Sequence, residues 1–173
     1  MKKILKKILW VVLVLLVIFL LIGLFVPKVE YTTEVTVNEP IEEVWQKYND
    51  LNTLSEWIPE VISIKPIKET PNTVGSQYEM VVESGGSSIT MVETITAFKE
   101  MEEVGLSFDA GNMIKNDIVY FSGDSLSTTI KGNHTCKGNN AFNRSLFAFF
   151  KGMFTDIDQT YMNQFKAWAE GDN

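Results

Sequence analysis

The stretch NEPIEEVWQKYNDLNTLSEWIPEV, residues 38–61, predicts two short helices that carry large aromatic side chains. The proline at its third position fits the first turn of a helix, where a missing N–H costs little. Apolar residues then recur every three or four positions, which gives the helix one apolar face. A capping box formed by Thr53 and Glu56 predicts the start of the second helix. Trp45 and Trp57 therefore lie on helices that need a surface to pack against.

The amino-terminal 26 residues differ from the rest of the chain. Residues 1–7 carry four lysines, and an uncharged apolar run follows over residues 8–26. At about 1.5 Å per residue, a run of about 19 residues just spans a hydrocarbon core about 30 Å thick. The alternative is a cleaved signal peptide, but its apolar region is usually about 7–15 residues long and ends in a small-x-small site.

The run instead ends Gly-Leu-Phe-Val-Pro, without such a site. We therefore expect a signal anchor that crosses a membrane once. Because lysines stay on the cytoplasmic side of a membrane, residues 1–7 are expected to form a cytoplasmic stub. Residues 27–173 are then expected to form one domain outside the cytoplasm.

The charge of the domain excludes one class of partner. Setting aside the four lysines of the stub leaves 11 of the 15 basic residues against all 22 acidic ones. Nucleic-acid binding needs clustered Lys and Arg, so no nucleic-acid partner is predicted. The single cysteine, Cys136, also excludes an intramolecular disulfide.

Alternating and turn-bounded segments predict an antiparallel sheet. Residues 30–37 alternate as a half-buried strand. Short turns separate the segments that follow, and short connections favour antiparallel neighbours, so about seven strands are expected. The further predicted strands are Val61–Lys68, Ser76–Glu83, Ser88–Phe98, Val104–Ala110, Ile114–Phe121 and Leu126–Lys137.

The carboxy-terminal segment predicts one long amphipathic helix, because its apolar residues recur every three or four positions. We expect this stripe to face the sheet, since a sheet and a helix with one apolar face each must pack together. Asp158 lies off the central line of the stripe and is expected to be exposed. The residues of this apolar stripe are Leu146, Phe150, Met153, Ile157, Tyr161, Phe165 and Trp168.

The order of these elements resembles the polyketide cyclase/dehydrase and lipid-transport superfamily, also called SRPBCC, START-like or helix-grip proteins. The resemblance covers about residues 30–169. It implies an α+β helix-grip fold, in which a sheet of about seven antiparallel strands wraps around the long helix with an internal cavity between them. The positions that carry it are Val37, Pro40, Glu42, Glu43, Val44, Trp45 and Trp57.

In such a fold Trp45 is expected to pack in the core, and Trp57 to lie nearer the cavity mouth. Large apolar and aromatic residues are typical of an adaptable ligand pocket, although they would equally suit a filled core. The predicted cavity-lining residues are Trp57, Tyr78, Met80, Met91, Phe108, Tyr120, His134, Phe150, Met153 and Ile157.

The residues that could perform catalysis are few. His134 and Cys136 are predicted on the same inward face of the last strand. They could form a nucleophile pair or part of a metal site, or His134 could simply be hydrogen-bonded beside a small buried cysteine. Asp117 is predicted to face outward, and Arg144 could pair with an acidic ligand or form a surface ion pair. No catalytic set, metal or cofactor is predicted.

Three functions remain open from the sequence. The first is a membrane-anchored domain that binds a hydrophobic small molecule or lipid. The second is a cyclase, dehydratase or hydrolase that acts on an apolar substrate, for which His134 is the candidate base. The third is an interaction domain without a small ligand, which a filled core and a large apolar surface patch would favour.

Overall fold

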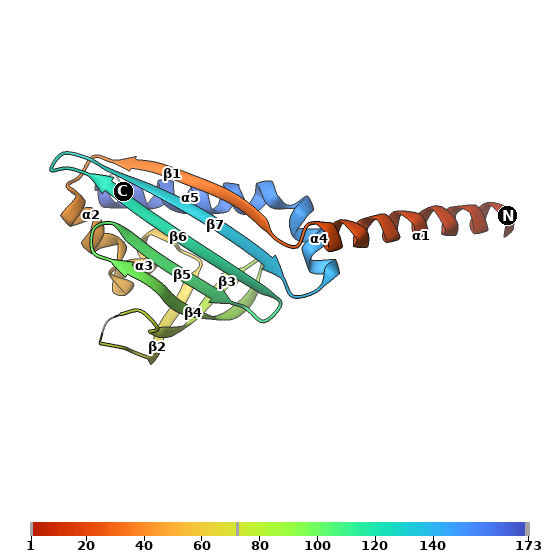
Figure 1. Ribbon diagram of the computed structural model, residues 1–173, viewed down its shortest axis with the longest axis horizontal. Coiled ribbons are helices and arrows are strands. Elements are labelled where there is room, and N and C mark those ends of the chain that lie inside the picture. Colours follow the sequence, from red (N-terminus) through yellow and green to blue (C-terminus); the bar gives the residue numbers. More distant parts are fainter. Residues whose placement is uncertain (1, 72, 172–173) are drawn as a thin grey trace.

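The computed structural model describes residues 2–71 and 73–171. A long helix, α1 (Lys2–Phe25), projects from one end of an α+β domain, as Figure 1 shows. Within the described residues, α1 is the one helix long and apolar enough to cross a membrane, judged by length and composition alone.

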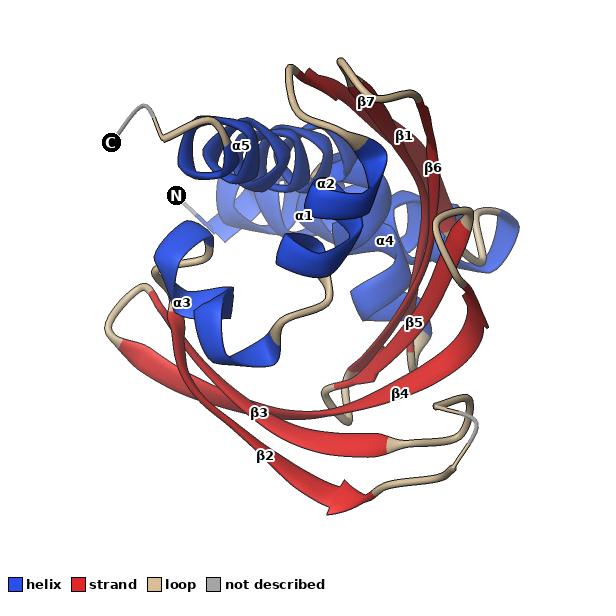
Figure 2. Cartoon of the chain, turned by 90° about the vertical axis from the view of Figure 1, so that its left-hand side faces the viewer, coloured by secondary structure: helices blue, strands red, loops and turns tan. Residues whose placement is uncertain are grey.

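The seven described strands form a single antiparallel sheet, as the sequence predicts. Their order across the sheet is β1-β7-β6-β5-β4-β3-β2, so the first strand pairs with the last. The sheet curves around α2, α3 and α5, which lie on its concave side (Figure 2). The strands are β1 (Val29–Val37), β2 (Val61–Lys68), β3 (Gln77–Ser84), β4 (Ser87–Lys99), β5 (Glu103–Asp109), β6 (Met113–Gly123) and β7 (Thr128–Gly138).

The stretch over residues 38–61 forms three short elements: α2 (Ile41–Tyr48), the 3-10 turn η1 (Leu51–Thr53) and α3 (Leu54–Trp57). The predicted capping box is wrong, because the Thr53 side chain makes no cap hydrogen bond. Its hydroxyl donates to the Asp50 carbonyl oxygen instead, and the Asp50 carboxylate caps η1 by accepting from the Asn52 N–H.

The aromatic residues of α2 and α3 meet the carboxy-terminal helix in the core. The Trp45 and Tyr48 rings both pack edge-on against Phe121 of β6, with centroids 5.0 and 5.1 Å away. Trp57 packs against Phe165, which is completely buried, with ring centroids 5.1 Å apart. Trp45 therefore packs in the core as predicted, and Trp57 belongs to the same core.

The predicted long helix is divided at Phe150 into α4 (Ala141–Phe149) and α5 (Lys151–Ala169). Phe150 has φ −99° and ψ 18°, which departs from helical geometry. Gly152 weakens the helix at this point, since glycine is a poor helix former. The break lets Phe147 of α4 turn back onto Phe154 of α5, with ring centroids 5.3 Å apart.

The end of α1 packs against α4. The Phe19 ring lies 5.5 Å from Phe142 and 5.6 Å from Phe149. The backbone N–H of Gly23 donates to the Ser145 hydroxyl, which in turn donates to the Phe19 carbonyl. A Cβ atom at Gly23 would lie 1.9 Å from the Ala141 carbonyl oxygen, so only glycine permits this approach of the two helices.

Candidate functional site

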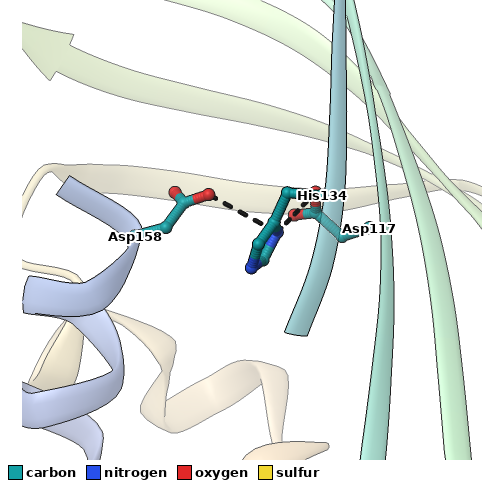
Figure 3. Close-up of side chains that lie close together, drawn as sticks. All are labelled: Asp117, His134 and Asp158. Carbon is teal, nitrogen blue, oxygen red and sulfur yellow. Dashed lines mark ion pairs between the residues drawn. The ribbon is translucent and has the colours of Figure 1, made fainter. Parts of the chain in front are cut away.

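A group of polar side chains is buried where α5 crosses β1, β7 and β6. We call it the polar cluster. In Figure 3, Asp158 of α5 and Asp117 of β6 lie on either side of His134 on β7. The full cluster consists of Tyr31, Thr33, Lys115, Asp117, His134 and Asp158.

Asp158 joins α5 to three strands through one carboxylate oxygen. The Tyr31 hydroxyl donates to Asp158 Oδ2 at 2.8 Å, and the Lys115 ammonium lies 2.9 Å from the same oxygen. His134 Nδ1 is 3.5 Å away. The prediction that Asp158 is exposed is therefore wrong: its side chain is largely buried, because Lys115 and Tyr31 satisfy its charge inside the fold.

Asp117 holds the other side of the cluster. Its Oδ2 lies 2.6 Å from the Lys115 ammonium, and its Oδ1 lies 2.9 Å from His134 Nδ1. That second contact is close but does not have hydrogen-bond geometry, so both atoms are buried without a hydrogen-bond partner. The other imidazole nitrogen, Nε2, is 2.8 Å from the Thr33 hydroxyl.

The charges in the cluster stabilise one another. Burial opposes the charge on Lys115, but the carboxylates of Asp117 and Asp158 outweigh it and raise the pKa of the ammonium. Burial likewise disfavours the Asp117 carboxylate, and the nearby Lys115 and His134 reverse that effect and lower its pKa. Burial, together with the Asp158 charge, raises the pKa of Tyr31, which remains a neutral donor.

The two carboxylates and the imidazole also have the spacing of a metal site. Their ligand atoms lie within 4.8 Å of one another. However, the Lys115 ammonium contacts both carboxylates, at 2.6 and 2.9 Å, and already supplies the compensating positive charge. A metal ion would have to displace Lys115, so these residues do not fit a resident metal.

A second buried acid lies further along the concave face. Glu93 of β4 is 4% exposed and sits in register between Tyr78 of β3 and Phe108 of β5. Among the described residues, its carboxylate has no hydrogen-bonding or ion-pair partner. Burial, assisted by the Asp117 charge, raises the pKa of Glu93 to about 7. Such a group can hold or release a proton near neutral pH.

Five of the six predicted lining residues that lie on strands are on the concave face of the sheet. Tyr78, Met80 and His134 are buried, and Met91 and Phe108 are partly buried against the core. Trp57 is packed between Tyr48 and Phe165.

The prediction that Tyr120 lines the cavity is wrong, because its side chain is exposed on the outer face of β6. The prediction that Asp117 faces outward is wrong for the same reason: the two faces of β6 were interchanged. In fact Asp117, Val119 and Phe121 share the inner face of β6. The inward charge is tolerated because Lys115, two residues away on the same face, pairs with it.

The apolar stripe of α5 is covered at only one end. Phe165 is completely buried, whereas Ile157 is 41% exposed, Met153 50% and Phe150 49%. The last three are the predicted ligand residues of this helix. Figure 2 shows α5 running beside β1 and β7, while β2 and β3 curve away on the other side. The amino-terminal half of α5 therefore presents an uncovered apolar surface, formed by Phe150, Met153 and Ile157.

Two further sequence hypotheses concern Cys136 and Arg144. Cys136 is completely buried, and burial raises the pKa of its thiol to about 11, which disfavours a reactive thiolate. The interpretation as a hydrogen-bonded histidine beside a buried cysteine therefore fits best. The Arg144 guanidinium donates from Nε to the Gly138 carbonyl oxygen and connects α4 to the end of β7.

A hollow on the surface of the protein borders the polar cluster. It has a volume of about 480 Å³, lies against the edge strand β1, and includes Tyr31 and His134 in its lining. The other lining residues are Glu30, Thr32, Asn133, Thr135 and Lys151.

Sequence reasoning missed the polar cluster, although one signal could have revealed it. β6 and β7 are joined by a four-residue loop, Asp124–Ser127, and their register pairs Asp117 with His134. Residues paired across two antiparallel strands point to the same face. An inward His134 therefore requires an inward Asp117 once the hairpin loop is recognised.

Several solved structures share this fold. A Thermus thermophilus protein matches with a TM-score of 0.68 and 13% identity, over 84% of this chain and 99% of its own. The Zhui aromatase/cyclase from a Streptomyces species matches with a TM-score of 0.62 and 12% identity, over 81% and 95%. The di-domain ARO/CYC StfQ from the steffimycin biosynthetic pathway gives 0.67 and 12%, over 84% and 51%. At these identities the likeness establishes the fold.

A search of curated proteins finds no match to this sequence. A family-level comparison does find one. The sequence model described as polyketide cyclase / dehydrase and lipid transport matches residues 28–142, which is more than half of the chain. The match begins just after α1 and ends at the start of α4, so it covers the entire sheet. The chain therefore belongs to the polyketide cyclase / dehydrase and lipid transport family.

Proposed function

We propose that this protein is a membrane-anchored domain that binds a hydrophobic small molecule or lipid between α5 and the concave face of the sheet. The observation that carries the proposal is the uncovered end of the apolar stripe. Phe150, Met153 and Ile157 are each about half exposed, although they continue the stripe that ends in the fully buried Phe165. An apolar ligand placed there would remove these side chains from water, and burial of apolar area favours binding.

The concave face offers polar groups for the other end of such a ligand. Asp117 Oδ1 and His134 Nδ1 are buried and lie 2.9 Å apart, without good hydrogen-bond geometry. Imperfectly paired buried polar atoms are costly, and a ligand hydroxyl or carbonyl that reached them would reduce that cost. Apolar walls with a few polar groups are typical of pockets for small molecules.

The anchor is supported by α1. Its apolar part is long enough to span a bilayer, and the four lysines before it favour an amino terminus in the cytoplasm and a domain outside. A protease added to spheroplasts should digest a carboxy-terminal tag and leave an amino-terminal tag intact. A soluble, secreted form that begins near Lys28 would contradict the anchor.

Native mass spectrometry tests the binding function. Residues 28–173, purified from cells, should carry a co-purified apolar ligand that solvent extraction removes. Met153→Asp should lower the ligand-bound fraction, because it places a charge on the uncovered apolar surface. Thr160→Asp adds the same charge at an exposed position of α5 and should leave binding unchanged. Apo protein alone in all three samples would contradict the proposal.

Glu93 favours a second candidate function, catalysis on the bound ligand. A buried carboxyl group with a pKa of about 7 is suited to proton transfer near neutral pH. Two of the similar structures are described as aromatase/cyclase proteins. If this chain is also an enzyme, the recovered ligand should change chemically on incubation with the wild type, and Glu93→Gln should abolish the change. An unaltered ligand in both cases would leave binding as the function.

A further inference from the structure

The surface of α4 carries exposed aromatic residues that the fold leaves uncovered. Phe142 and Phe149 are seven residues apart, on the same face of the helix, and both remain exposed although they contact Phe19 of α1. Phe150 follows them directly and begins the uncovered surface of α5. Two exposed phenylalanines on one short helix, with a third directly after it, form an apolar patch of the kind that marks a contact with a partner or a membrane.

The position of α4 along α1 indicates what that partner is. α4 contacts α1 at Phe19 and Gly23, whereas the apolar run continues to Val26. Phe19 is seven residues before Val26, which corresponds to about 10 Å along a helix. If the apolar run of α1 lies in a bilayer, its last turns lie in the outer part of the hydrocarbon core. The face of α4 that holds them must then lie at the same depth.

We propose that α4 is an interfacial membrane helix, with Phe142 and Phe149 inserted at the bilayer surface beside α1. Interfacial helices bury their apolar face about 5–10 Å into the boundary between head groups and acyl chains, which agrees with the depth that α1 imposes. This inference rests on the proposed membrane anchor. It adds that the uncovered surface of α5 opens at the membrane, so the ligand class is an amphiphile taken from the bilayer.

The charges near α4 fit this orientation. A hollow of about 430 Å³ lies where α1 ends and α4 meets α5, and it contains Lys28 and Lys151. Lys28 is paired with Glu30 at 2.6 Å, so Lys151 supplies the net positive charge. The remainder of the chain beyond the stub is strongly acidic and is repelled by anionic lipid. The α4 end is therefore the end of the domain that can approach head groups. The remaining lining residues are Val26, Val29, Glu30 and Ala148.

Site-specific fluorescence on the full chain tests the proposal. The chain is reconstituted in vesicles of phosphatidylcholine and phosphatidylglycerol, and Phe149→Cys or Phe142→Cys is labelled with an environment-sensitive dye. Cys136 is completely buried, so the unsubstituted chain should take up little label. Thr160→Cys is the control, since it is exposed and lies ten residues, about 15 Å, further along α5 than Phe150.

At both phenylalanine positions the emission should shift to the blue and should be quenched by lipids that carry a spin label near the head group. Lipids labelled deep in the acyl chain should quench it less, because the helix is interfacial. The control position should respond only to a water-soluble quencher. Vesicle flotation separates the two levels of the proposal. A chain that does not float contradicts the anchor, whereas a chain that floats with water-quenched labels at both positions overturns the interfacial placement of α4 alone.

Discussion

The two halves of α5 have the same apolar spacing and different surroundings. In the carboxy-terminal half, Met162, Phe165 and Ala169 are buried among the aromatics of α2 and α3. In the amino-terminal half, Met153 and Ile157 remain about half exposed. The difference arises because α2 and α3 close only one end of the curved sheet (Figure 2). A periodic pattern predicts which face of a helix is apolar, but the partner of that face depends on the tertiary structure.

The polar cluster contacts α5 through Asp158, in the amino-terminal half of the helix, and holds that open half near the sheet. Asp158 connects α5 to Tyr31 of β1 and Lys115 of β6. The next residue, Gln159, donates from its side-chain amide to the Glu34 carbonyl oxygen of β1. The amino-terminal half of α5 is therefore attached to the sheet by buried polar contacts, whereas the carboxy-terminal half adds apolar core packing to its polar contact between the Lys166 ammonium and the Thr36 carbonyl oxygen.

The largest difference between the halves should appear on truncation of Phe165. Phe165→Ala should lower the free energy of unfolding of residues 28–173 by about 3–5 kcal/mol, because it leaves a cavity in a closed core. Met153→Ala, at the open end, should cost less than about 1 kcal/mol, because its side chain is half exposed. Denaturant unfolding of both variants measures the contrast. Equal losses would mean that both halves are packed alike.

The pH dependence of stability tests whether water reaches Glu93 on the concave face of the sheet. In the folded protein the pKa of Glu93 is about 7, so the side chain keeps its proton up to about that pH. In the unfolded chain the carboxyl group releases the proton near its ordinary pKa of 4.5. Between these values the folded state binds more protons, so stability decreases as pH rises. Glu93→Gln removes this loss and should make the protein more stable than the wild type at pH 8, by on the order of 3 kcal/mol.

The advantage of Glu93→Gln should shrink as the pH falls toward 4.5 and disappear below that value, where Glu93 is protonated in both the folded and the unfolded wild type. Urea unfolding at several pH values measures it. Glu79→Gln is the matched control, because Glu79 lies on the neighbouring strand and faces the outside of the sheet. A wild type and a Glu93→Gln variant with the same pH profile would show that water reaches Glu93.

The polar attachment of α5 should contribute less than the core. Asp158→Asn keeps the shape of the side chain but removes the charge that Tyr31 and Lys115 contact. We expect a loss of about 1–3 kcal/mol, the usual cost of a weakened buried hydrogen-bond set. Asp156→Asn, at an exposed position of the same helix, should change stability by no more than about 0.5 kcal/mol. Equal effects would mean that Asp158 is solvated in solution.

The fold was predictable from the sequence because its signals are local. Alternation and turns give the strands, and the spacing of Trp45, Phe165 and their neighbours gives the helix faces. The facing of β6 was not predictable from alternation alone, because both of its faces carry apolar residues. Ile118 and Tyr120 are on one face, and Val119 and Phe121 are on the other. The hairpin register places Asp117 beside His134, but the polar cluster also depends on Asp158, which lies 41 residues further along the chain than Asp117, and no local pattern reveals that contact.

Ile157 gives the smallest expected change in stability and the sharpest test of the open half. Ile157→Ala should cost about 1 kcal/mol or less, because an isoleucine that is 41% exposed gains only part of the 1.5–3 kcal/mol available from full burial. The substitution should nevertheless weaken binding of the apolar ligand, because Ile157 belongs to the uncovered surface that the ligand would bury. Thr160→Ala, one turn further on at an exposed position, should change neither property. Denaturant unfolding and ligand titration of residues 28–173 separate the two quantities.

A loss of stability above about 2 kcal/mol on Ile157→Ala would place Ile157 in a packed core, and the amino-terminal half of α5 would then be closed like the carboxy-terminal half. Unchanged stability together with unchanged binding would remove Ile157 from the ligand site.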